Sequence, residues 1–294
     1  MKITITGSLG NISGPLAAAL VKAGHQVTVV SSSENRKAEI EALGATAAIG
    51  SVEDVGFLTG AFKGADVVYT MVPQQHDSDD YKGFIRKTAQ NLADAVKAAG
   101  VTHVVNLSSI GAHLPAGTGP IAGMHDGEEI LNKLDGVIIK HLRPASFYYN
   151  FFANIGMIKH GGILGGNYPA GTRLVLVHPK DIADVAFEEI TTPFTGTSIR
   201  YIASDETTAA EVTKIIGAAI GKPELPWVEF TDEQSIGGMQ QAGLSEDVAK
   251  NLTEMGNATK SGIIGEDYDK HKPALSKRKF EEFVRGEFSA KYNA

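Results

Sequence analysis

The sequence predicts an α/β fold with a doubly wound parallel sheet and a smaller, mostly helical C-terminal lobe. Two observations support it. In the first half of the 294-residue chain, apolar strand-like segments alternate regularly with helix-like segments. After about Arg143 this rhythm changes and the chain becomes aromatic and glycine-rich. Apolar strands that are regularly separated by helices are typical of parallel strands buried on both faces.

The first half contains six expected strands with helices between them. The strands are expected at 2–6, 26–31, 46–50, 65–72, 102–109 and 136–144, and the helices at 13–24, 34–44, 53–64, 79–100 and 127–134. The helix over 13–24 is rich in alanine and leucine, and Gly24 supplies a C-terminal stop. Gly44 closes the polar second helix in the same way. Right-handed crossovers then place all the strand C-terminal ends at one edge of the sheet, where ligands bind.

The second half is expected to add further sheet and a helical lobe over that edge. Aromatic residues fill 146–158, and a glycine-rich loop follows at 161–171. Further strands are expected at 174–178 and 198–203, and helices at 179–190 and 208–221, with Thr207 or Thr208 as the N-cap of the latter. We therefore divide the chain into residues 1–147 and 148–294, with an approximate boundary and interleaved elements.

Composition excludes several classes of function. The net charge of −7 argues against nucleic-acid and anionic-membrane binding, and the absence of cysteine excludes disulfides and thiolate chemistry. The longest charge-free apolar stretch, 144–158, is shorter than the roughly 20 residues of a membrane span. The nine histidines are scattered without ligand spacing, so no metal site is expected. We see no signal peptide and expect a soluble, cytoplasmic protein.

The first strand runs into a glycine turn, TGSLGNISG, and then into a helix. Gly7 permits a tight turn, and Gly10 permits close approach of backbone to a pyrophosphate. The helix that follows directs free N–H groups and its positive dipole end at such an anion. Ser13 stands where a third glycine is common, a position that matters mainly for close packing of helix on strand, and serine is the next smallest choice there. Its hydroxyl can also cap the helix or donate to a phosphate. The alternative is a plain strand-to-helix turn that binds nothing, but the position in a βαβ unit favours a dinucleotide.

The end of the second strand favours NADP(H) over NAD(H). NAD-binding folds usually carry an acid there, which bonds the ribose hydroxyls. Here the strand ends in Ser31 and Ser32, with Arg36 soon after, and these groups suit a 2′-phosphate. The alternative for Arg36 is an ordinary place on the surface of a helix.

Six segments occur in an order that resembles the NmrA-like group of atypical short-chain dehydrogenase/reductases. They are TGSLGNIS, GSVEDVGFLTGAFKGADVVYTMVP, HVVNLSSIGAH, HLRPASFYYNFF, HPKDIADVAF and TAAEVTKIIGAAIGKP, and they span about residues 1–230. The resemblance implies a Rossmann domain that holds NADP(H), or less often NAD(H), at the glycine turn. It places Met71, Val72 and Pro73 at the nicotinamide, and Ser51 and Val52 near the adenine. Many relatives have Asp in place of Ser51 and Arg in place of Ser31.

The expected cofactor-binding residues are therefore drawn from the turn and from the ends of four strands. They are Gly7, Ser8, Leu9, Gly10, Asn11, Ile12, Ser31, Ser32, Arg36, Ser51, Val52, Met71, Val72, Pro73 and Ser108.

The catalytic residues are less well marked. Short-chain reductases typically use a serine and a Tyr-x-x-x-Lys pair, in which the lysine lowers the pKa of the tyrosine. Ser108 and Ser109 end the fifth strand, where that serine belongs, but the following helix has no tyrosine. His125 is nearest to the vacant position and is the candidate acid, with Ser109 as a second catalytic candidate. The alternative is that His125 only packs at the helix start; His113 is a weaker candidate.

The sequence leaves three functions open. The first is an NADP(H)-dependent oxidoreductase that reduces a small apolar carbonyl or quinone-like substrate, because hydride transfer to a quinone needs little help from an enzyme acid. The second is a non-catalytic NAD(P)-binding redox sensor that acts through a protein partner, which the missing Tyr-x-x-x-Lys favours. An isomerase or dehydratase is the third, although such relatives usually keep the tyrosine and lysine.

Overall fold

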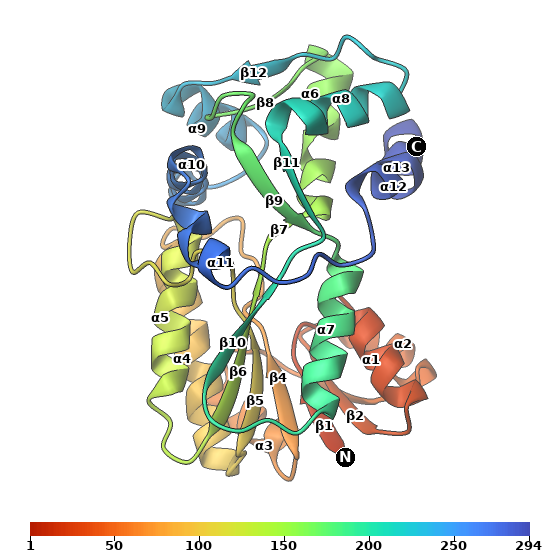
Figure 1. Ribbon diagram of the computed structural model, residues 1–294. Helices are drawn as coiled ribbons and strands as arrows, with labels where there is room; N and C mark the ends of the chain where they lie inside the picture. Colours follow the sequence, from red (N-terminus) through yellow and green to blue (C-terminus); the bar gives the residue numbers. More distant parts are fainter.

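The computed structural model describes residues 1–294 and contains a seven-stranded parallel sheet as its base (Figure 1). The strand order is β3-β2-β1-β4-β5-β6-β10, which is a Rossmann order with an added edge strand. The strands are β1 (Lys2–Ile5), β2 (Gln26–Ser31), β3 (Thr46–Ile49), β4 (Val67–Thr70), β5 (His103–Leu107), β6 (Ile138–Pro144) and β10 (Ser198–Ile202). The predicted α/β fold class is confirmed, and the order reverses between β1 and β4, which is where ligands bind in such sheets.

Helices cover both faces of this sheet. One face carries α1 (Ser13–Lys22), α2 (Lys37–Ala42) and α7 (Pro179–Thr191), whose apolar side chains share one core cluster. The other face carries α3 (Val55–Phe62), α4 (Tyr81–Ala99) and α5 (Pro120–Asn132), which pack on a second cluster. Leu58 and Phe62 of α3 are fully buried. The strands are thus buried on both sides, as parallel strands require.

The helix ends follow the local signals in the sequence. Gly24 and Gly44 adopt positive φ angles of 85° and 87° just after α1 and α2. Asp80 accepts the Gly83 N–H and begins α4, and Thr208 accepts the Glu211 N–H at the start of α8 (Ala209–Ala219). The helix expected at 127–134 is longer than that segment, because α5 already begins at Pro120, a residue suited to a first helical turn.

The C-terminal lobe is built from two small sheets and short helices around an aromatic core. Its strands are β7 (Ser146–Phe147), β8 (Leu164–Gly166), β9 (Arg173–Val177), β11 (Asp205–Thr208) and β12 (Trp227–Glu229). Its helical segments are η2 (Tyr148–Asn154), α6 (Ile155–Gly161), α8 (Ala209–Ala219), α9 (Asp232–Gln241), α10 (Glu246–Ser261), η3 (Ile263–Gly265), α11 (Glu266–Lys270), α12 (Phe280–Phe283), η4 (Val284–Phe288) and α13 (Ser289–Asn293), while the short η1 (Glu34–Arg36) precedes α2. Tyr148, Phe151, Phe283 and Phe288 lie in the core of this lobe.

The two halves of the chain interleave. The strand at 174–178 was expected to extend the sheet, and it forms β9 in the small sheet β11-β9-β7. The chain then returns to the main sheet through α7 and β10, and β10 pairs in parallel with β6. β10 runs parallel to the other strands, so α7, which precedes it, begins where those strands have their C-terminal ends, as α1 does. The two helices lie side by side in Figure 1. The N-termini of α1 and α7 therefore both face the edge that the lobe covers.

Close contacts hold the lobe over this edge. A side chain on Gly119 would lie 1.9 Å from the Asn251 carbonyl oxygen, so the loop after β5 is pressed directly against α10. The Ser245 N–H donates to the His76 carbonyl over 3.1 Å and thereby fastens the loop after β4. None of the helices combines the length and the apolar character needed to cross a membrane.

Candidate functional site

The glycine turn has an unusual backbone. Gly7 has φ of 92°, and Ser8, with φ of 55°, is the one non-glycine residue of the chain at positive φ. A positive φ is unfavourable for a residue with a Cβ and persists only where the surroundings impose it. Here the Ser8 N–H donates to Val30 O over 3.0 Å and its hydroxyl donates to Ser31 Oγ over 2.8 Å. The strain therefore lies at the turn that the sequence marks.

Gly7 and Gly10 have different roles in the turn. A Cβ on Gly7 would lie 2.2 Å from Met71 Sδ and 2.6 Å from Ser13 Oγ, so this position admits no side chain. Gly10 is exposed, and a Cβ there would meet only the Gly7 carbonyl oxygen, at 3.1 Å. Gly7 is thus required for packing inside the protein, whereas Gly10 keeps the outer surface of the turn open. This fits the predicted close approach of a ligand at Gly10.

The turn presents free donors. The backbone N–H groups of Asn11, Ile12 and Ser13 have no acceptor within the protein. They stand at the start of the ten-residue helix α1, where the helix dipole adds partial positive charge. N–H groups without an acceptor at a helix start form a ready anion site. The geometry of the turn therefore suits a phosphate group.

Ser13 packs where α1 meets β1, which agrees with the packing role expected at the third position of the turn. The residue is 1 % exposed, and its hydroxyl donates to the Thr6 carbonyl over 2.8 Å. The N-cap position of α1 belongs to Ile12, without a side-chain hydrogen bond, so the Ser13 hydroxyl does not cap the helix. In this structure the hydroxyl ties the helix start to the end of β1, and its donation to a phosphate stays a prediction.

The ends of β2 and β3 lie beside the turn. Ser31 is buried, and its hydroxyl oxygen accepts from Ser8 and from the Ser33 N–H, so its own proton stays available to a ligand. Ser32 is exposed, and Arg36 is paired with Glu39 on the surface at 2.5 Å. No acid ends β2.

Ser51 and Val52, the residues expected near the adenine, follow β3 directly. The Ser51 hydroxyl accepts the Glu53 N–H over 3.1 Å, which shapes the loop after β3. The Val52 carbonyl accepts from Asn91 of α4 over 3.3 Å. The assignment of Ser51 and Val52 to adenine stays a prediction.

The ends of β4 and β5 continue the same edge. The Met71 N–H donates to Thr6 Oγ1 over 2.8 Å, which holds β4 against β1 where the strand order reverses. Val72 and Pro73, which follow, are half-buried. The Ser108 hydroxyl is buried and has no partner, whereas the Ser109 hydroxyl donates to Ile110 O over 3.0 Å. A buried hydroxyl without a partner costs free energy. The assignment of Ser108 to the cofactor stays a prediction.

His125 lies in the second turn of α5 with Nδ1 2.9 Å from the Ala112 carbonyl oxygen. A carbonyl only accepts, so Nδ1 carries a proton and Nε2 is the nitrogen that exchanges one. His113 differs, because both of its ring nitrogens are buried without a partner and burial lowers its pKa. Helix α5 contains no tyrosine. The catalytic assignments of His125 and Ser109 stay predictions.

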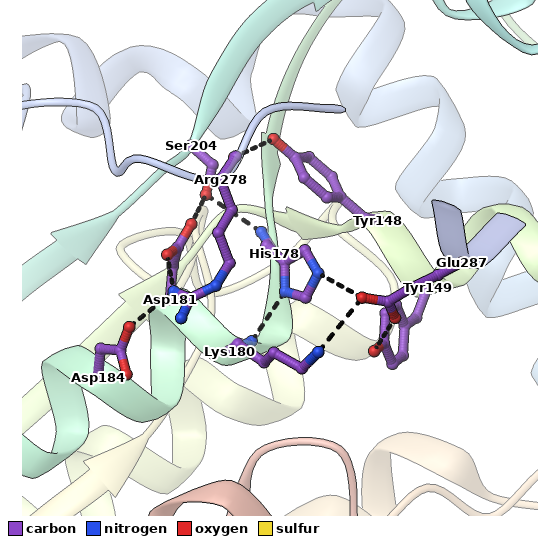
Figure 2. A network of polar contacts seen from close by, with 9 residues as sticks. All are labelled: Tyr148, Tyr149, His178, Lys180, Asp181, Asp184, Ser204, Arg278 and Glu287. Carbon is purple, nitrogen blue, oxygen red and sulfur yellow. Dashed lines mark hydrogen bonds and ion pairs between the residues drawn. The ribbon is translucent and has the colours of Figure 1, made fainter. Parts of the chain in front are cut away.

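Sequence reasoning missed a polar network at the start of α7 (Figure 2). His178 caps α7, because its Nδ1 accepts the Lys180 N–H over 3.0 Å, and its Nε2 lies 3.2 Å from Glu287 Oε1. Tyr149 also donates to Glu287. The partners are 109 and 138 residues apart in the chain, so no local spacing could have indicated them.

The same network explains the aspartates of the PKDIADVA segment. Asp181 is buried, accepts from Ser204 over 2.6 Å and pairs with Arg278, which also pairs with Asp184. Tyr148 is fully buried and donates to Asp205 over 2.5 Å. These contacts give Asp181, Asp184 and Tyr148 structural roles. No group of three or more His, Asp or Glu side chains has the arrangement of a metal site.

Residues 7–130 match a family of domains described as NAD(P)H-binding. This segment contains the strained turn, the free N–H groups and the buried Ser108 hydroxyl. The N-terminal half has the strand order of a Rossmann fold, and this segment of it is similar to NAD(P)H-binding domains. Its glycine cradle and its unpartnered donors fit a dinucleotide, whose phosphates need donors and whose close approach needs a bare backbone.

Known proteins resemble the whole chain and not only the NAD(P)H-binding domain. An NAD(P)H azoreductase of Xenophilus azovorans is 25 % identical over 257 residues, which cover 86 % of this chain and 85 % of the azoreductase. Triphenylmethane reductase of Citrobacter sp., solved with NADP(H), has a TM-score of 0.80 and 19 % identity, covering 97 % of this chain and 99 % of the reductase. An NADPH-dependent quinone oxidoreductase of Escherichia coli, solved with NADPH, has a TM-score of 0.76 and 19 % identity, with the same coverages of 97 % and 99 %. The lobe is therefore shared as well as the domain.

We expect the substitution Ser13→Gly to lower stability without weakening NADPH binding. It removes one buried hydrogen bond and adds backbone freedom at a helix start, which together cost about 1–2 kcal/mol. Thermal unfolding and NADPH titration on the same samples measure both quantities. Ser13→Ala is the control, because it loses only the hydrogen bond. A tenfold loss of NADPH affinity in Ser13→Gly would show that the hydroxyl serves the ligand after all.

Proposed function

We propose that this protein is an NADP(H)-dependent oxidoreductase of the NmrA-like type that reduces a small, apolar carbonyl or quinone-like substrate in the cytoplasm. The observation that carries the proposal is the trio of free N–H groups at the start of α1, inside an NAD(P)H-binding domain. The named activities of the relatives support it, since the azoreductase, the triphenylmethane reductase and the quinone oxidoreductase are all reductases. The names of these three relatives refer to azo, triphenylmethane and quinone compounds, which are small molecules and not polymers.

NADP(H) is favoured because the end of β2 offers donors and a cation. The hydroxyls of Ser31 and Ser32 and the guanidinium of Arg36 lie on the strand end and the short helix after it. Phosphate groups are bound by such hydroxyls and by arginine. Arg36 is exposed and its pair with Glu39 is a surface pair, which costs little to exchange.

We expect Arg36→Gln to weaken NADPH binding about tenfold and to leave NADH binding within twofold. The reason is that only NADPH carries the 2′-phosphate that the guanidinium would contact, and a hydrogen bond to a charged group contributes about this much. Fluorescence titration with both dinucleotides measures the two constants. Lys63→Gln, which removes an exposed charge at the opposite edge of the sheet, is the matched control. Equal losses for NADPH and NADH would contradict the assignment.

The residues of this chain would bind the dinucleotide, orient the substrate and protonate it. The bound dinucleotide supplies a hydride at its nicotinamide. The N–H groups at the start of α1 hold its phosphates, and Met71, Val72 and Pro73 border its nicotinamide end. His125 supplies a proton from Nε2 when the substrate needs one, because Nδ1 is held by Ala112. Ser109 would orient the substrate oxygen at the end of β5. A quinone accepts a hydride with little help from an acid, so the missing tyrosine does not prevent the reaction.

The test mixes the purified protein with NADPH and a panel of quinones, azo dyes and aromatic aldehydes. We expect oxidation of NADPH, followed at 340 nm, faster than in the protein-free blank for at least one acceptor class. No acceleration with any acceptor would overturn the oxidoreductase proposal.

A second candidate is a redox sensor that binds the dinucleotide and a protein partner without turnover. The observation in its favour is that α5 has no tyrosine and that its His125 is already bonded to Ala112. A sensor should bind NADP⁺ and NADPH with clearly different affinities in calorimetry and should show no turnover. Equal affinities with turnover would favour the enzyme.

A further inference from the structure

We propose that Lys180 is an additional cofactor-binding residue, which exchanges its contact with Glu287 for the pyrophosphate of the dinucleotide. This inference rests on the proposed cofactor site at the glycine turn. It concerns a residue on α7, outside the residues 7–130 that match the NAD(P)H-binding family.

The topology brings Lys180 to the turn. Helices α1 and α7 pack side by side on one face of the sheet and begin at the same edge. Ile12, at the end of the turn, shares a core cluster with Ile182 and Ala183 from the first turns of α7. Packed helices lie about 8–10 Å apart between axes, so a long side chain on the first turn of one helix spans the gap to the start of the other. Lys180 occupies that first turn.

The turn itself lacks a cation. The segment TGSLGNISGP from Thr6 to Pro15 contains neither lysine nor arginine, although a pyrophosphate carries two negative charges. Arg278, in the segment before α12, is engaged by Asp181 and Asp184 of the adjacent α7. Lys180 is 48 % exposed, and its carboxylate partner is Glu287, so it is the cation of α7 that could turn toward the phosphates once that contact is exchanged.

The contact between Lys180 and Glu287 is one that can be given up. The lysine Nζ lies 3.4 Å from Glu287 Oε1, which is long for a charge-assisted hydrogen bond. Glu287 has two other donors, since Tyr149 donates to it and His178 lies 3.2 Å away (Figure 2). His178 Nδ1 accepts a backbone N–H, so Nε2 carries the ring proton and donates to Glu287. Departure of Lys180 therefore leaves the carboxylate with hydrogen-bond partners.

The backbone around Glu287 fixes its place. Glu287 lies in η4, a π-helical segment that follows directly on α12. The Ser289 hydroxyl donates to the Val284 carbonyl over 2.7 Å and stabilises this wider turn. Such segments re-aim side chains and are frequent at functional sites. Here the segment turns Glu287 toward α7, where it holds Lys180 close to the glycine turn before the cofactor arrives.

The test measures NADPH binding by fluorescence titration for wild type, Lys180→Gln and Lys180→Arg. We expect Lys180→Gln to raise the dissociation constant about tenfold, because a hydrogen bond to a charged group is lost. Lys180→Arg should stay within about twofold of wild type, since the charge is kept. The loss in Lys180→Gln should shrink at high salt, where charge contacts are screened. Thermal unfolding of each variant excludes misfolding, and Lys63→Gln controls for net charge.

The probe 2′-AMP separates the two phosphate sites, because it carries the 2′-phosphate without the pyrophosphate. Lys180→Gln should bind 2′-AMP as wild type does. Glu287→Gln, which releases Lys180, should bind NADPH at least as tightly as wild type. An unchanged NADPH affinity in a folded Lys180→Gln variant would overturn the inference, and so would an equal loss for 2′-AMP. Failure of the wild type to bind NADPH at all would instead overturn the proposed function.

Discussion

Gly10→Val should abolish NADPH binding, with a loss of at least a hundredfold, while leaving the melting temperature nearly unchanged. Gly10 is exposed, and a Cβ there meets only the Gly7 carbonyl oxygen, at 3.1 Å. The valine side chain then projects into the space over the free N–H groups of the turn, where the phosphates need close backbone approach. Isothermal titration with NADPH and thermal unfolding on the same preparation measure the two effects.

Gly7→Ala is the informative comparison for Gly10→Val. Gly7 has φ of 92° and its Cβ would collide with Met71 and Ser13, so Gly7→Ala should lose stability and binding together. Gly10→Val should instead lose NADPH binding while keeping its stability. If Gly10→Val retained NADPH affinity within threefold, the turn would be an ordinary strand-to-helix connection, and the dinucleotide would have to bind elsewhere.

Glu128→Gln should destabilise the fold by about 3–5 kcal/mol. Arg143 and Glu128 are 5 % and 4 % exposed and form a bidentate ion pair. Arg143 Nε donates to Glu128 Oε1 over 2.9 Å, and Arg143 Nη2 donates to Glu128 Oε2 over 2.6 Å. Removing the Glu128 carboxylate leaves the buried Arg143 charge with only the longer contacts to Asp267 and Tyr201, and removing one partner is the costly way to break a buried ion pair. Urea unfolding followed by circular dichroism gives the free energy of unfolding for each variant.

The control for Glu128→Gln lies one residue away. Glu129 is exposed on the same helix, so Glu129→Gln should change stability by less than about 0.5 kcal/mol. A double variant that makes both Arg143 and Glu128 apolar should recover much of the loss, because it removes the unpaired charge. A cost below about 1 kcal/mol for Glu128→Gln would mean that Tyr201 and Asp267, the other partners of Arg143, carry the charge alone.

The identity and order of most elements could be predicted because their signals are local. A helix end needs only a glycine such as Gly24, and a helix start needs only an oxygen acceptor such as Asp80 or Thr208. The glycine turn could be located for the same reason. The packing role of Ser13 follows from its place in the turn, but the acceptor of its hydroxyl, the Thr6 carbonyl, depends on how β1 packs beneath α1 and could not be predicted.

The sequence by itself determined the doubly wound sheet, the position of the dinucleotide turn and the absence of a tyrosine in α5. Only the tertiary structure decided that α7 and β10 return to the main sheet, that Arg143 finds Glu128, and that Glu287 reaches His178 and Lys180 from the far end of the chain. The physical reason is the range of the interactions. Periodicity and caps depend on residues within one or two turns, whereas a buried ion pair or a shared carboxylate depends on the packing of elements that are distant in the chain.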